Sequence, residues 1–153
     1  DLWLKQEVSI EEFIRTGPMV HEYTHLVFDH MTNGNYTRWF TEGLAQYAEY
    51  KVNGYEWLTP GNTFNQQLYS LAELDEKFDS LDNQSLAYRQ SLAAVRYLAD
   101  VHGEDALRKV IASLQQGRKM EQAIQTAIGL DYRQYEQNMT EWAIANMNHR
   151  GIW

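Results

Sequence analysis

The sequence predicts a mainly α-helical fold with at most a small strand near the N-terminus, and three observations favour this class. Apolar residues recur every three or four positions along most of the chain, which places them on one face of a helix. Three glycines, Gly103, Gly117 and Gly129, divide the C-terminal half into segments of helical length and suit helix C-termini. A composition of 44% hydrophobic residues with only two prolines is typical of an ordered globule rather than a linker.

The N-terminal residues carry the one pattern that suits a strand. Residues 2–8 alternate weakly in hydropathy and could form an edge strand or an extended arm. Ser9 and Glu12 make a capping box that opens a short helix. The Thr16-Gly17-Pro18 stretch ends that helix and leaves Pro18 near the first turn of the next one.

Helical patterns account for most of the remaining chain. The pattern that begins near Pro18 continues to Asn33-Gly34-Asn35, a strong turn signal, and a second pattern runs from Thr37 to Val52. A loop rich in glycine, asparagine and aromatic residues follows at 53–65 and could help to form a cleft. The elements expected beyond it are a short helix at residues 70–78, a loop at 80–84, and helices at 85–102, 105–116, 120–128 and 132–148.

The first of the two long helical patterns contains His21-Glu22-Tyr23-Thr24-His25, an HExxH pentapeptide. At positions i and i+4 the two imidazoles share one helical face about 6 Å apart, so both can reach a single zinc ion. Glu22 directly follows His21 and so lies beside that face of the helix, where it can contact a water on the metal without being a ligand. The pentapeptide predicts two ligands and a general base, although histidines at this spacing could also be ordinary half-buried residues.

A third ligand is expected from the second helix. If the two helices fold back antiparallel about Gly34, residues equidistant from that glycine lie level with each other. His25 is nine residues before Gly34 and Glu42 is eight after it, so the Glu42 carboxylate comes opposite the second histidine. Glu49 would lie about 10 Å further along the helix at 1.5 Å per residue. Glu42 is therefore the predicted ligand.

Three neighbouring residues have predicted supporting roles. Gly43 sits inside a helix, where glycine costs about 1 kcal/mol relative to alanine and usually marks a close approach. We expect it to let the second helix pack tightly against the first beside the metal, or to be a packing glycine with no metal nearby. Glu49 could accept a hydrogen bond from a ligand histidine, with Gln46 as the other candidate.

These residues resemble a known family. HEYTH followed by Trp39-Phe40-Thr41-Glu42-Gly43-Leu44-Ala45-Gln46-Tyr47 is similar to the paired motifs of the peptidase MA-like zinc metallopeptidases, in the gluzincin clan. The resemblance implies a zinc ion held by His21, His25 and Glu42, with Glu22 as base. It also implies a zincin-like helical domain in which the two motif helices form a hairpin, followed by a C-terminal helical bundle. Sixteen residues separate His25 from Glu42, slightly fewer than is usual in the clan.

A third segment, residues 88–107, is similar to the stretch after the zinc motif in gluzincin aminopeptidases. There a tyrosine opens the helix and hydrogen-bonds the tetrahedral intermediate, and Tyr88 stands at the matching position. A phenol is suited to donating to a developing oxyanion, but Tyr88 could equally pack in the core. Arg89 and Gln90 differ from the lysine and glycine usual in those aminopeptidases, which weakens any inference of exopeptidase action.

Composition excludes several other classes of protein. The net charge of −8 and the pI near 5.0 disfavour nucleic-acid binding, which relies on clustered lysine and arginine. Zero cysteines exclude disulfides and thiolate zinc sites. No apolar run is long enough to span a bilayer and no signal peptide is visible. The family resemblance suggests an extracytoplasmic or cell-envelope protein.

The length predicts one domain, residues 1–153, which could be the C-terminal part of a longer protein because gluzincins commonly place a β-sheet before the HExxH helix. The leading functional reading is a zinc-dependent peptidase acting on a peptide or protein substrate. The alternatives are a catalytically silent zinc-binding relative that acts as a binding or assembly module, and a purely structural helical domain. The sequence leaves open the cleavage specificity, the choice between endopeptidase and exopeptidase action, and the oligomeric state.

Overall fold

The computed structural model describes residues 17–148, and over that range it contains helices and loops but no strand. The mainly α-helical fold class is confirmed for this part of the chain. The elements are α2 Gly17–Thr32, α3 Arg38–Asn53, η1 Pro60–Asn62, α4 Leu71–Glu76, η2 Phe78–Ser80, α5 Gln84–His102, α6 Glu104–Gln115, α7 Met120–Ile128 and α8 Tyr132–Met147. The strand considered at residues 2–8 and the capping box of Ser9 and Glu12 lie outside the described residues.

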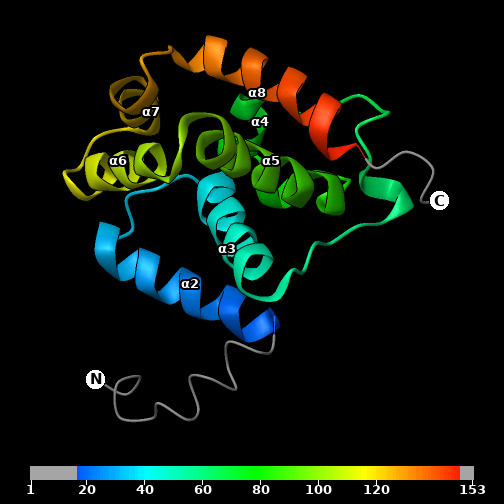
Figure 1. The fold of residues 1–153 in the computed structure, drawn as a ribbon, viewed down its shortest axis with the longest axis horizontal. Helices are drawn as coiled ribbons and strands as arrows, with labels where there is room; N and C mark the ends of the chain where they lie inside the picture. Colours follow the sequence, from blue (N-terminus) through cyan, green and yellow to red (C-terminus); the bar gives the residue numbers. More distant parts are fainter. Residues whose placement is uncertain (1–16, 149–153) are drawn as a thin grey trace.

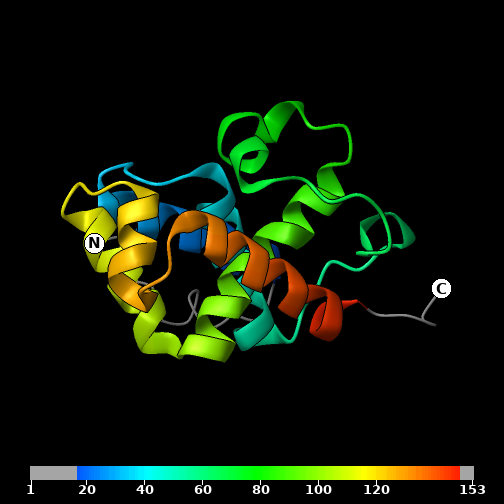
Figure 2. The same cartoon turned by 90° about the horizontal axis from the view of Figure 1, so that it is seen from above.

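Helix α5 forms the centre of the molecule. It packs against α3, α6 and α8, and it is buried along nearly its whole length. Figure 1 shows α2 and α8 on opposite sides, with α3 and α5 between them. The view from above in Figure 2 shows α4 and its flanking loops to one side of α5. Helix α5 has neighbours on several sides. Its first turns can therefore lie beside the α2–α3 pair while the rest of the helix contributes side chains to the hydrophobic core.

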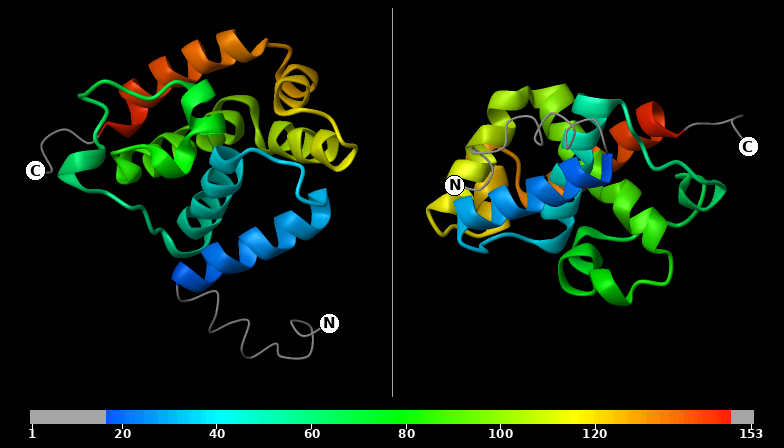
Figure 3. Two further views of the ribbon diagram at one scale, coloured as in Figure 1. Left: turned by 180° about the vertical axis from the view of Figure 1, so that it is seen from behind. Right: turned by 90° about the horizontal axis from the view of Figure 1, so that it is seen from below.

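The turn between α2 and α3 forms where the sequence predicts it. Asn33 and Gly34 have φ values of 53° and 76°, in the left-handed region that asparagine and glycine adopt most readily. The Gly34 N–H donates to the carbonyl of Asp29 over 3.1 Å and satisfies one of the free carbonyls at the end of α2. Thr37, in an extended conformation, precedes α3. Helix α3 then packs against α2, as the two views of Figure 3 show, so the expected hairpin is confirmed.

Gly43 marks a close approach, but the partner helix is different from the predicted one. A Cβ atom at this position would lie 2.2 Å from the carbonyl oxygen of Ser91 and 2.7 Å from Cγ2 of Val95. Both residues belong to α5, so the prediction that Gly43 packs against the HExxH helix is wrong. The reason is that α3 is covered on two sides, by α2 and by α5, and its glycine faces α5.

Gly43→Ala should lower the free energy of unfolding by about 1–3 kcal/mol, because a methyl group must displace backbone atoms of α5. The better helix propensity of alanine offsets only part of this cost. The measurement is chemical denaturation followed by circular dichroism. Gly61→Ala is the control, since its nearest contact would be an ordinary 3.7 Å and its φ is not positive. Equal stability of the two variants would contradict the tight α3–α5 contact.

No helix between residues 17 and 148 combines the length and the apolar character that crossing a bilayer requires.

Candidate metal centre

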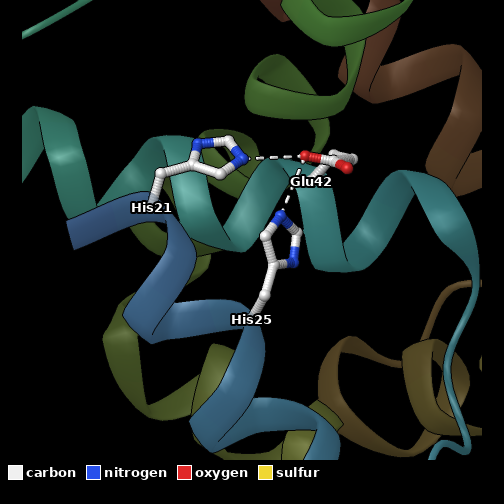
Figure 4. A group of neighbouring side chains, drawn as sticks. All are labelled: His21, His25 and Glu42. Atoms are coloured by element: carbon white, nitrogen blue, oxygen red, sulfur yellow. Dashed lines mark hydrogen bonds and ion pairs between the residues drawn. The ribbon is translucent and has the colours of Figure 1, made fainter. Parts of the chain in front are cut away.

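The three predicted ligands meet between α2 and α3. Nε2 of His21 lies 2.9 Å from Oε1 of Glu42, and Nε2 of His25 lies 3.1 Å from the same oxygen. Figure 4 shows both imidazoles projecting from α2 toward this carboxylate of α3. One potential ligand atom from each side chain falls within 4.8 Å of the other two. Among the described residues, these three form a group that could hold a metal ion.

The second nitrogen of each imidazole already has a partner. Nδ1 of His21 contacts Oε1 of Glu49, and Nδ1 of His25 lies 2.8 Å from Oγ1 of Thr41. These contacts orient the rings and leave both Nε2 atoms facing the Glu42 oxygen, as metal-binding histidines require. The predicted hydrogen bond between Glu49 and one of the two HExxH histidines is confirmed. Gln46 instead donates to the backbone carbonyls of Tyr88, over 2.7 Å, and Glu42, over 3.3 Å.

The charge state of His25 also suits metal binding. Burial, followed by the neighbouring His21 and Arg38, lowers the pKa of the His25 imidazole to about 4. A neutral imidazole at neutral pH is the form that binds a metal. The negative charge of Glu22 acts in the opposite direction on this pKa. The Glu22 side chain is exposed, which leaves it accessible to a water molecule.

Glu42 is a buried carboxylate, with 4% of its surface exposed, and such a group needs partners to offset the loss of hydration. Its two oxygens have different neighbours. Oε1 faces the two histidines, whereas Oε2 forms an ion pair with Arg38 and lies 3.5 Å from the hydroxyl of Tyr88. Arg38 was not predicted from the sequence.

The donor set fits a zinc ion. Two imidazole nitrogens and one carboxylate oxygen are the protein ligands of many catalytic zinc sites, which keep a further position open. Bonds of about 2.0–2.1 Å in a tetrahedral site put ligand atoms about 3.3 Å apart. The nitrogen-to-oxygen distances of 2.9 and 3.1 Å are only slightly shorter. Ligand atoms this close together could share one ion.

Tyr88, near the start of α5, faces the Glu42 carboxylate of the candidate metal centre. Its half-buried ring lies between Trp57, at 5.6 Å, and Phe78, at 5.3 Å, measured between ring centroids. A cavity of about 270 Å³ adjoins it, lined by His21, Gln46, Glu49, Tyr55, Trp57 and Tyr88. The loop after α3 thus contributes to the cleft, as the sequence suggested.

The residues after Tyr88 hold that loop in place. Arg89 is 2% exposed and donates to Oε2 of Glu56 over 2.7 Å and to the backbone of Met147 over 3.1 Å. The Gln90 side chain pairs with both backbone groups of Tyr69. The two departures from the aminopeptidase pattern therefore have structural roles. Arg89 joins the cleft loop and the end of α8 to α5, and Gln90 joins the segment before α4 to α5. Sequence reasoning missed this, because the partners are more than twenty residues away.

The chain as a whole can be compared with known proteins. Searches among curated proteins and among solved structures find no match. A family model described as Peptidase MA superfamily matches residues 12–145, a range that contains α2, α3 and α5 with all the side chains of the candidate metal centre. Since the match covers most of the sequence, the chain belongs to the Peptidase MA superfamily.

Proposed function

We propose that this protein is a zinc-dependent peptidase that hydrolyses peptide bonds with Glu22 as general base. One observation carries the proposal. Nε2 of His21 and of His25 converge on one oxygen of Glu42, while separate partners hold the opposite nitrogens of both rings. Ordinary half-buried histidines would not need this arrangement, whereas a catalytic zinc site does.

The family supports a peptide or protein substrate. A bound zinc ion would supply Lewis acidity toward the scissile carbonyl and lower the pKa of a water. The exposed Glu22 carboxylate would take a proton from the attacking water and return it to the leaving amine. The Tyr88 hydroxyl, which projects toward the Glu42 carboxylate, would donate to the oxyanion as the carbonyl becomes tetrahedral. An extracytoplasmic or cell-envelope location is part of the proposal and rests on the family resemblance.

Metal depletion and reconstitution test this function. The purified chain is stripped with a chelator, reloaded with zinc, and assayed for zinc content and for hydrolysis of a mixed peptide library. We expect one equivalent of zinc, with hydrolysis that disappears on stripping and returns on reloading. His25→Ala should abolish both, whereas His30→Ala, an exposed histidine on the same helix, should abolish neither.

Two results would contradict the proposal. One equivalent of zinc without hydrolysis of any library peptide would favour a silent zinc-binding module. Failure to bind zinc at all would favour a purely structural domain.

Tyr88→Phe should reduce kcat by roughly 10²-fold while KM and zinc affinity stay nearly constant, since the hydrogen bond to an oxyanion exists only in the transition state. Steady-state kinetics on one cleaved peptide, with zinc titration alongside, provides the measurement. Tyr55→Phe removes another hydroxyl from the same cavity and should leave kcat near its original value. A phenylalanine variant of Tyr88 that turns over at the native rate would assign this side chain to packing alone.

A further inference from the structure

We propose that Arg38 is a positioning residue that holds one oxygen of Glu42 and thereby limits this ligand to a single oxygen toward the metal. The inference rests on the proposed zinc site. Oε2 of Glu42 is paired with the Arg38 guanidinium, whereas Oε1 is the oxygen within reach of both ligand histidines. The two oxygens of the Glu42 carboxylate therefore have different partners.

The position of Arg38 runs against local helix energetics. It is the first residue of α3, where the positive end of the helix dipole disfavours a cation. It also precedes Glu42 by four residues, and a basic residue before an acidic one is the weaker order for such a pair. Helix stability alone does not explain an arginine here, and local rules are most often broken at functional positions.

Arg38 is itself held by the segment that follows α4. Its guanidinium carbon lies 5.1 Å from the centroid of the Phe78 ring, and Nη2 lies 3.3 Å from Oδ1 of Asp79. Only 36% of the arginine side chain is exposed. A planar group fixed by a ring on one side and a carboxylate on another can restrict the rotation of a third partner. Residues of η2 thus hold Arg38 in place, and Arg38 in turn restricts the orientation of the Glu42 carboxylate.

The consequence concerns the number of open positions on the metal. A carboxylate that binds through both oxygens occupies two coordination positions, and one that binds through a single oxygen occupies one. A hydrolytic zinc site needs a position for water and space for the substrate carbonyl. By retaining Oε2, Arg38 would keep those positions available. Its positive charge would also reduce the electron donation from Glu42 to the ion.

Cobalt substitution tests this role without relying on turnover. Co²⁺ replaces zinc in the stripped protein, and its visible absorption is strong in four-coordinate sites and weak in six-coordinate ones. We expect Arg38→Gln to bind Co²⁺ and zinc at least as tightly as the native chain, but with a weaker visible absorption because both oxygens of Glu42 become available. Its kcat should fall by roughly 10–100-fold, as for other residues that contact metal ligands.

Two further variants sharpen the test. Arg38→Lys keeps a positive charge beside Oε2 and should largely restore the native absorption. Arg96→Gln removes another arginine that pairs with an acidic residue four positions away, Asp100, and should change neither spectrum nor affinity.

The outcomes separate this inference from the proposed function. If the native chain binds no metal, the zinc site itself is refuted. If the native chain binds Co²⁺ and folded Arg38→Gln gives the same spectrum, or loses the metal altogether, the one-oxygen role of Arg38 is refuted while the site stands. If Arg38→Gln does not fold, the visible absorption of Co²⁺-loaded Arg38→Lys decides whether Arg38 has this role. A lysine variant with a weak spectrum would refute a role for positive charge.

Discussion

Glu22→Gln should reduce kcat by about 10²–10⁴-fold while zinc content and helical structure remain unchanged. The amide keeps the shape of the carboxylate but cannot accept a proton from water. Glu22 is exposed on α2 and is not among the three residues that converge on the metal position, so neither folding nor metal binding depends on it. The paired measurement is zinc stoichiometry and turnover on the same preparation.

Asp29→Asn provides the matched control, since Asp29 is also exposed on α2. It should retain native turnover, because an asparagine oxygen can still accept the hydrogen bond that Tyr36 donates over 2.7 Å. A glutamine variant of Glu22 that still cleaves peptides would show that another group accepts the proton.

Glu42→Ala should lower zinc affinity by orders of magnitude, because it removes the one carboxylate oxygen that faces both histidines. Glu49→Gln should have a smaller effect, about 10–100-fold, because Glu49 orients His21 without facing the metal position. Competition with a chromophoric chelator measures both affinities. If Glu49→Gln bound zinc more weakly than Glu42→Ala, Glu49 would replace Glu42 as the third ligand.

The positions of the three side chains in the candidate metal centre were largely predictable because their geometry is local. His21 and His25 are one helical turn apart, and that spacing alone places their rings together. Glu42 follows from the register about Gly34, since a short turn between two helices leaves little freedom in which residues come level. The structure brings all three together.

The residues that support the centre were harder to predict because their partners come from distant segments. Arg38 is fixed by η2, some forty residues further along the chain, and Gly43 is packed against α5 rather than α2. Arg89 reaches Glu56 and the end of α8. No periodicity or motif in the sequence carries this information, since these contacts depend on how the helices are packed.

One element boundary also differs for a tertiary reason. The helix expected at residues 70–78 ends at Glu76, and Phe78 starts a separate 3₁₀ turn. Gln84, the first residue of α5, donates to the carbonyls of Phe78, over 2.7 Å, and Leu81, over 2.9 Å. These bonds, together with burial of the Phe78 ring, favour the tighter turn over a continued α-helix.

The contact at Gly43 has a consequence for the proposed catalysis as well as for stability. Gly43 follows Glu42, the proposed third ligand, and the Ser91 carbonyl that it meets is one turn after Tyr88 on α5. Because Gly43 lacks a Cβ atom, α3 and α5 can approach closely here, and this approach sets the distance between Glu42 and the Tyr88 phenol. A methyl group there would push α5 outward, and a misplacement of about 1 Å can cost roughly 10²-fold in rate. In the proposed enzyme, Gly43 would thus fix the distance between the metal ligands on α2 and α3 and the phenol on α5.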